Sequence, residues 1–221
     1  MNAIRFISYP LIATWLVLGV FAAIPAITGL IDGWKDYLWF AAGALLYLGL
    51  RQLKFFGKNE SWMQVFSHEL SHTAVSLLFL HKIDSFTASS RRGKVSYRGS
   101  NVGDLFISLA PYCLPLATYI LLLLRLLSTQ ESMYIYDILI GFTASFYICS
   151  FVAQTGTHQS DITDQGTVRA FMFIVAAWIF NATIVLLSMR GGLWGALKFI
   201  AHQYGQSLEK AWHAISAMLM S

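Results

Sequence analysis

Long, almost uninterrupted apolar stretches recur along the 221-residue chain, and polar residues gather in the short segments between them. A helix needs roughly 20 predominantly apolar residues to cross the about 30 Å of hydrocarbon in a bilayer. By this measure the candidate transmembrane helices are residues 9–31, 36–53, 62–80, 105–127, 133–153 and 167–188. The pattern therefore predicts an all-α membrane protein with about six transmembrane helices.

Two segments depart from this pattern. Residues 83–101 partly alternate polar and apolar positions on either side of residues 91–93, which predicts a short β-hairpin after the third helix, with a surface loop as the alternative. Over residues 191–221, apolar positions recur at spacings of three and four, which predicts an amphipathic helix in the membrane interface. The short connections elsewhere predict a single transmembrane domain over residues 1–190.

The composition supports an integral, multi-pass membrane protein. Hydrophobic residues make up 57% of the chain and charged residues 12%, and the mean hydropathy is +0.59. Soluble proteins have about 45–50% apolar and about 25% charged residues. The net charge of +4 comes from basic residues scattered around the predicted helices, so we expect contact with the lipid bilayer and no nucleic-acid binding. The basic residues divide almost evenly between the two sides, which leaves both the orientation and the membrane open.

The third predicted helix carries the sequence His68-Glu69-Leu70-Ser71-His72, an H-E-x-x-H motif. On a helix the two histidines share one face and can reach one metal ion, while the glutamate can address a bound water. Zinc fits this set of donors best. Ionisable residues inside a span cost on the order of 3 kcal/mol each, which favours a compensating metal. The alternative is a cluster of hydrogen-bonded side chains without a metal.

A catalytic zinc ion needs a third protein ligand and an open position for water. Residues 154–165 form the most polar stretch between two predicted helices and contain His158, Asp161 and Asp164. The two aspartates are three residues apart, so both would point the same way if the sixth helix began here. Only one of them is needed as a ligand.

These motifs resemble the site-2 protease class of intramembrane zinc metalloproteases, the M50 group, and indicate a minimal M50B-like member. The resemblance covers about residues 63–167 and depends mainly on the H-E-x-x-H motif. It implies hydrolysis of peptide bonds of a membrane protein or peptide within or near the bilayer. It further implies His68 and His72 as zinc ligands and Glu69 as the general base that activates water.

The chain departs from the family at the third ligand. The usual motif is Asn-Pro-Asp-Gly or a close variant, whereas this chain has Ser-Asp-Ile around Asp161 and Asp-Gln-Gly from Asp164. Asp161 is our first choice and Asp164 the alternative. The implied chemistry is zinc hydrolysis, in which the metal acidifies water and polarises the scissile carbonyl while Glu69 moves the proton.

Two other functions stay open. One is a zinc-dependent membrane hydrolase that acts on a lipid or another amide, and it predicts a metal without proteolysis. The other is a non-catalytic membrane regulator on the same fold, whose function would not depend on Glu69. For the hydrolases we expect a cleft through which water reaches the histidines. For the protease we also expect a hairpin edge that can pair with an extended substrate.

Overall fold

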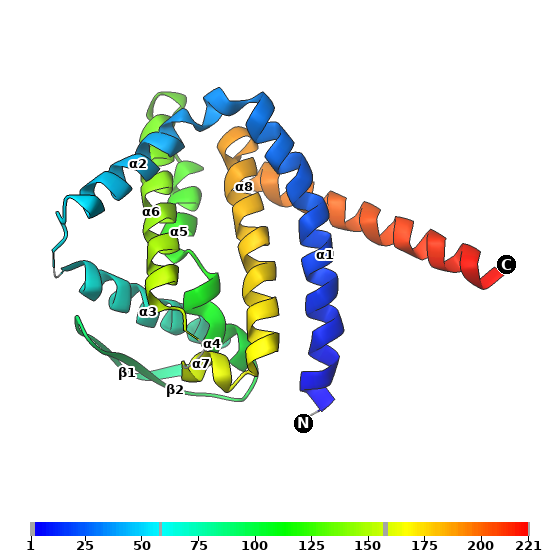
Figure 1. The fold of residues 1–221 in the computed structure, drawn as a ribbon, viewed down its shortest axis with the longest axis horizontal. Coiled ribbons are helices and arrows are strands. Elements are labelled where there is room, and N and C mark those ends of the chain that lie inside the picture. Colours follow the sequence, from blue (N-terminus) through cyan, green and yellow to red (C-terminus); the bar gives the residue numbers. More distant parts are fainter. Residues whose placement is uncertain (1–2, 58, 157–158, 221) are drawn as a thin grey trace. The chain divides into compact units, whose positions relative to one another are not determined.

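A computed structural model of the protein describes residues 3–57, 59–156 and 159–220. The chain is predominantly helical, with one small antiparallel sheet (Figure 1). It divides into two compact units, one formed by Met1–Leu38 with Val175–Ser221 and the other by Trp39–Ile174. All the residues of the candidate site lie in the second unit.

The first unit consists mainly of helix α1 (Ala3–Asp32), the 3₁₀ helix η1 (Trp34–Tyr37) and most of helix α8 (Thr167–Met220). The rings of Trp15 and Phe180 meet edge to face with their centroids 5.8 Å apart. Arg190 of α8 forms an ion pair with Asp36 of η1, in which the guanidinium lies 2.9 Å from the carboxylate. The backbone of α8 breaks at Gly192 (φ 67°, ψ 167°), next to residue 191, where the amphipathic helix was predicted to begin.

The second unit contains the hairpin, seven helical segments and the first turns of α8. Its elements are α2 (Leu38–Gln52), α3 (Asn59–Leu78), β1 (Lys82–Ala88), β2 (Gly93–Arg98), α4 (Asp104–Cys113), α5 (Leu116–Arg125), η2 (Gln130–Ser132), α6 (Met133–Gln154) and α7 (Ser160–Thr163). Helices α2 and α6 touch backbone to backbone, since a Cβ atom on Gly43 would collide with the carbonyl of Ile138. Small residues allow such close crossings.

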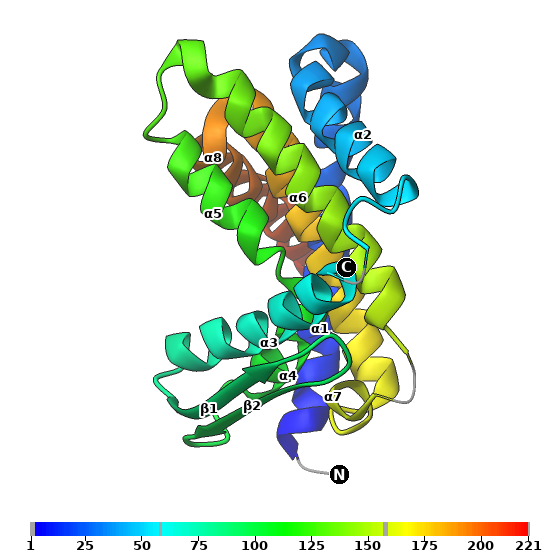
Figure 2. The ribbon, with the colours of Figure 1, turned by 90° about the vertical axis from the view of Figure 1, so that its left-hand side faces the viewer.

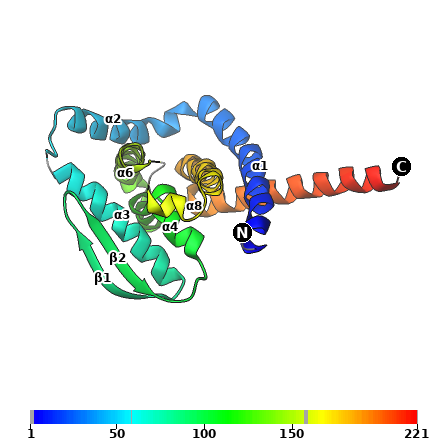
Figure 3. The same cartoon turned by 60° about the horizontal axis from the view of Figure 1, so that its bottom comes forward.

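The predicted hairpin is confirmed. Strands β1 and β2 pair in antiparallel fashion from Ala88↔Gly93 near the turn towards Lys82↔Arg98, with an irregularity before Ser85. The hairpin lies along α3, as Figures 2 and 3 show from two directions. Among the described residues the sheet has two strands, so β2 pairs with a strand on one side alone.

The number of long apolar helices is smaller than predicted. Among the described residues, three helices are long and apolar enough to cross a membrane, namely Phe6–Asp32, Gln130–Gln154 and Thr167–Met218. A fourth span is possible only if α4 and α5, which are bent by 79° against each other, are counted as one. These helices are compatible with a membrane protein, but the prediction of about six spans is not met.

The differences have local causes. Helix α2 has only 15 residues, and α3 carries the polar motif in its middle. The expected fourth span breaks between α4 and α5 at Leu114 and Pro115. Proline lacks the N–H group that would continue the helix, and the residue before a proline disfavours helical dihedral angles. A hydropathy average over the whole stretch does not register this break.

Candidate metal centre

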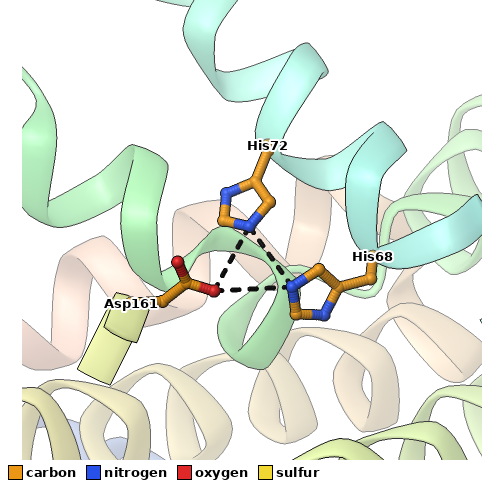
Figure 4. A group of neighbouring side chains, drawn as sticks. All are labelled: His68, His72 and Asp161. Carbon is orange, nitrogen blue, oxygen red and sulfur yellow. Dashed lines mark hydrogen bonds and ion pairs between the residues drawn. The ribbon is translucent and has the colours of Figure 1, made fainter. Parts of the chain in front are cut away.

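The two histidines of the motif come from one face of α3. His68 and His72 are one helical turn apart, and their side chains are only 15% and 12% exposed. The short helix α7 brings Asp161 to the same point, so that the three side chains converge (Figure 4). Ile162, the next residue of α7, is fully buried and anchors this short helix.

The distances between the three donor atoms fit a metal ion. The Nε2 atoms of His68 and His72 are 3.3 Å apart, and each lies 3.5 Å from Oδ2 of Asp161. In a tetrahedral site with bonds of about 2.1 Å, the corners lie about 3.4 Å apart. The three atoms therefore occupy positions that match one face of such a tetrahedron, and the cluster could hold a metal ion.

Hydrogen bonds behind the imidazoles determine which nitrogen faces the cluster. Nδ1 of His68 lies 3.2 Å from Oε1 of Gln154, and Nδ1 of His72 lies 2.8 Å from the carbonyl oxygen of Ile107. Carbonyl oxygens only accept hydrogen bonds, so each Nδ1 is the donor and carries the proton. In its neutral form, each imidazole presents the lone pair of Nε2 to the cluster, as metal-binding histidines do.

The charges at the cluster favour a cation between the three side chains. Burial raises the pKa of Asp161, but hydrogen bonds and charges from His68 and His72 outweigh it and hold this pKa well below its usual range. Burial lowers the pKa of His72, and its contacts with Asp161 outweigh that effect and raise it. These contacts favour the ionised form of Asp161, which attracts a positive charge.

Tyr112 holds the carboxylate of Asp161 from behind. Its hydroxyl donates a hydrogen bond to Oδ2 of Asp161 at 3.2 Å and also contacts Oε1 of Gln159. Tyr112 is almost fully buried in α4, and its carbonyl accepts a hydrogen bond of 2.7 Å from the hydroxyl of Tyr147. The third donor of the cluster is thus positioned by a buried network.

Glu69 lies between α3 and strand β2. Its side chain is buried, with 8% of the residue exposed, and it packs against Gly93 so closely that a Cβ atom there would collide with the carboxylate. Burial raises the pKa of Glu69, opposed by the charges of His68 and His72 and by a backbone hydrogen bond from Val95. The net effect is a raised pKa, as suits a group that takes up and releases a proton.

A partly open cavity of about 390 Å³ gives access to the cluster. His68, Glu69, His72 and Asp161 all line it, together with polar groups of β2 and α4. Water can therefore reach both the donor atoms and the Glu69 carboxylate. This is the cleft that the sequence predicts beside the histidines.

The remaining predicted residues lie elsewhere. Asp164 is exposed and follows the last residue of α7, where the chain turns through Gly166 (φ 84°) before α8 begins at Thr167. Because no single helix continues through both aspartates, Asp164 does not share the position of Asp161, and it is not part of the cluster. His158 lies outside the described residues.

Three groups that support the cluster were not found from the sequence. Gln154 begins the polar stretch that contains Asp161, so its polarity was a usable signal. Nothing in the sequence distinguishes Tyr112 from other aromatic residues of the apolar segments. The carbonyl of Ile107 belongs to the backbone, so no side-chain pattern can indicate its role.

No protein-family model, no curated protein and no solved structure matches this chain. The fold and the cluster define a helical protein with apolar helices long enough to cross a membrane and a three-residue site that could hold a metal ion. Its function has to be inferred from the chemistry of that site.

Proposed function

We propose that this protein is an intramembrane zinc metalloprotease of the site-2 protease class, an M50B-like member. It hydrolyses peptide bonds of a membrane protein or peptide within or near the bilayer. The observation that carries the proposal is the convergence of two Nε2 lone pairs and one carboxylate oxygen at 3.3–3.5 Å, with Glu69 lining the same cavity. The long apolar helices of the chain support an intramembrane location.

The donor set favours zinc among the biological metals. Two imidazoles and one carboxylate are typical of catalytic zinc sites, which keep a fourth position open for water or substrate. Magnesium and calcium prefer sites made of oxygen ligands alone. His68, His72 and Asp161 would hold the ion, and the cavity leaves room beside them.

In the proposed reaction, Glu69 moves the proton. A bound zinc ion supplies a Lewis acid that acidifies water and polarises a carbonyl. Glu69 accepts a proton from the attacking water and passes it to the leaving amine. The close packing against Gly93 and the backbone hydrogen bond from Val95 hold the carboxylate in place for both transfers.

Strand β2 offers a place for the substrate backbone. A helical substrate hides its carbonyl groups in its own hydrogen bonds, so it has to be extended before it can be cut. β2 runs past Glu69 and pairs with β1 on one side only. An extended peptide can therefore lie along β2, next to the residues that act on it.

The test is zinc stoichiometry of the full-length protein purified in detergent. We expect about one zinc per chain in the wild type and in Asp164→Ala, and loss of zinc in His68→Ala and Asp161→Ala, because three donors are needed. Glu69→Gln should keep the zinc and lose peptide hydrolysis. Asp164→Ala is the matched control, since it removes a neighbouring carboxylate outside the cluster.

The other functions correspond to other outcomes. A zinc-loaded protein that cleaves no peptide but hydrolyses a lipid or another amide in a Glu69-dependent way would replace the protease by a different hydrolase. A carefully prepared wild-type protein without zinc would favour a non-catalytic membrane protein, in which the three side chains form a polar cluster.

A further inference from the structure

A second cavity continues past Glu69 on the side of the hairpin turn. It has a volume of about 200 Å³ and shares His68, Glu69 and Gly93 with the first cavity. Its lining also contains Arg91 and Arg92, which belong to the turn between β1 and β2. An extended peptide that occupies both cavities therefore passes Glu69 and then the two arginines of the turn.

These two arginines have no ion-pair partner within the described parts of the chain. Elsewhere on the same hairpin, Arg98 is paired with Asp84 at 2.7 Å. The acidic residues that line the two cavities are Glu69 and Asp161, and both belong to the site itself. The turn end of the cleft thus carries positive charge that the protein does not neutralise.

We propose that Arg91 and Arg92 select a substrate with an acidic side chain within a few residues of the scissile bond. This inference rests on the proposed hydrolase function and names its substrate class. Arg91 precedes Gly93, the residue beside Glu69, by two positions. An extended peptide that passes Glu69 therefore reaches the turn within a few residues.

The chemistry of the turn favours a carboxylate in the peptide. A guanidinium group binds a carboxylate through two parallel hydrogen bonds, which gives direction as well as attraction. Arg91 and Arg92 are both exposed, and burying charged groups in hydrocarbon is costly. The acidic residue and the bond beside it therefore lie at the membrane–water boundary rather than in the bilayer centre.

The experiment compares two apolar peptides that differ only by Glu or Gln at one position, with that position moved along the sequence. Binding is measured to the full-length Glu69→Gln protein in detergent at low salt. We expect the best-placed Glu peptide to bind about fivefold more tightly than its Gln counterpart, as for a partly exposed ion pair. Added salt should reduce this preference.

Two sets of variants connect the preference to the turn. Arg91→Gln/Arg92→Gln should remove it, whereas Lys82→Gln, which removes an exposed charge of the same hairpin outside both cavities, should leave it intact. Arg91→Glu/Arg92→Glu should instead prefer a Lys peptide. This reversal distinguishes recognition of charge from damage to the hairpin.

Equal binding of the Glu and Gln peptides at every position would overturn the inference. Dependence on the two arginines only for binding to phosphatidylglycerol vesicles would also overturn it, since the turn would then contact lipid. Cleavage is followed separately with intact Glu69. Cleavage without charge preference refutes the acidic-substrate inference alone, and charge-selective binding without cleavage refutes the protease alone.

Discussion

At the residue scale, the groups behind the histidines orient the two rings of the candidate metal site. Gln154 accepts a hydrogen bond from His68, and the carbonyl of Ile107 accepts one from His72. Each bond fixes a tautomer and a ring orientation that would otherwise have to be selected on binding. Part of the entropy cost of metal binding is therefore met during folding.

The role of Gln154 leads to a prediction about metal affinity. Gln154→Ala should weaken zinc binding about 10–100-fold while leaving the stoichiometry at high zinc unchanged, because only the group behind a ligand is lost. Competition with a chelator measures this change. Gln64→Ala is the control, since Gln64 hydrogen-bonds Glu60 on α3 and not the cluster. Equal affinities of the two variants would show that Gln154 does not orient His68.

Gly93 gives a prediction about catalysis. A methyl group at this position would collide with the Glu69 carboxylate, whereas Gly156 has open space around it. Gly93→Ala should therefore lower the cleavage rate about 10²-fold or more, the usual cost of displacing a general base, with zinc retained. Gly156→Ala should leave the rate unchanged. Peptide cleavage and zinc content of both variants, measured together, check the expectation, and unimpaired cleavage by Gly93→Ala would contradict it.

The predictable part of the site is the part encoded locally. The spacing of His68 and His72 alone places two imidazoles on one helical face. The choice between Asp161 and Asp164 could not be made from spacing, because it depends on where α7 ends and α8 begins. The groups behind the ligands lie 86 and 35 residues away along the chain, and only the folded arrangement of α3, α4 and α6 brings them together.

At the element scale, the crossing of α2 and α6 depends on two glycines. A side chain on Gly43 would meet the backbone of Ile138, and one on Gly141 would meet the backbone of Phe40. Backbone atoms cannot move aside as a flexible side chain can. The two helices therefore keep their close contact only while both positions lack a Cβ atom.

This contact predicts opposite effects for two substitutions in one helix. Gly43→Ala should destabilise the protein by about 1–3 kcal/mol, because the added methyl overpacks the crossing. Gly49→Ala, which meets nothing within 4 Å, should be neutral or stabilise by up to about 1 kcal/mol through helix propensity. Denaturation of both variants in the same detergent measures the difference. A destabilised Gly49→Ala variant would indicate a general intolerance of α2 to substitution.

Local patterns also explain which elements could be predicted. The hairpin was found from alternation around Arg91 to Gly93, since strand pairing across a short turn is a local property. The excess of predicted spans arose because hydropathy averages ignore proline and treat a polar motif as a small penalty. The bend of 79° between α4 and α5 lies at a place where the chain is apolar on both sides. The missing N–H of Pro115 and the restricted dihedral angles of Leu114 before it account for the break.

At the scale of the whole molecule, the site is contained in one of the two compact units. All three donor residues lie within Trp39–Ile174, whereas α1 lies in the other unit. A metal ion held by the histidines of α3 and the aspartate of α7 would stabilise the arrangement of these two helices. Metal binding should therefore stabilise the second unit more than the first.

Metal removal gives the corresponding prediction. A ligand at one hundred times its dissociation constant stabilises the state that binds it by about 2.7 kcal/mol. Chelation should therefore speed amide hydrogen exchange about 10- to 100-fold in α3, α4 and α7 and leave α1 unchanged. Exchange followed by mass spectrometry in detergent, with and without zinc, provides the measurement. Asp161→Ala, already metal-free, should not respond, and equal acceleration in α1 would contradict local stabilisation.

In the proposed hydrolase, the separation of the donors along the chain sets when the metal site can be completed during synthesis. His68 and His72 leave the ribosome early, whereas Asp161 follows after α4, α5 and α6 have been made. At roughly 5–20 residues per second, this delay is on the order of ten seconds. A chain with the two histidines alone lacks the third donor that a catalytic zinc site needs, so the proposed activity would begin only after Asp161 has been made. The order of the ligands along the chain would thus delay the activity of the proposed hydrolase until most of the second unit has been synthesised.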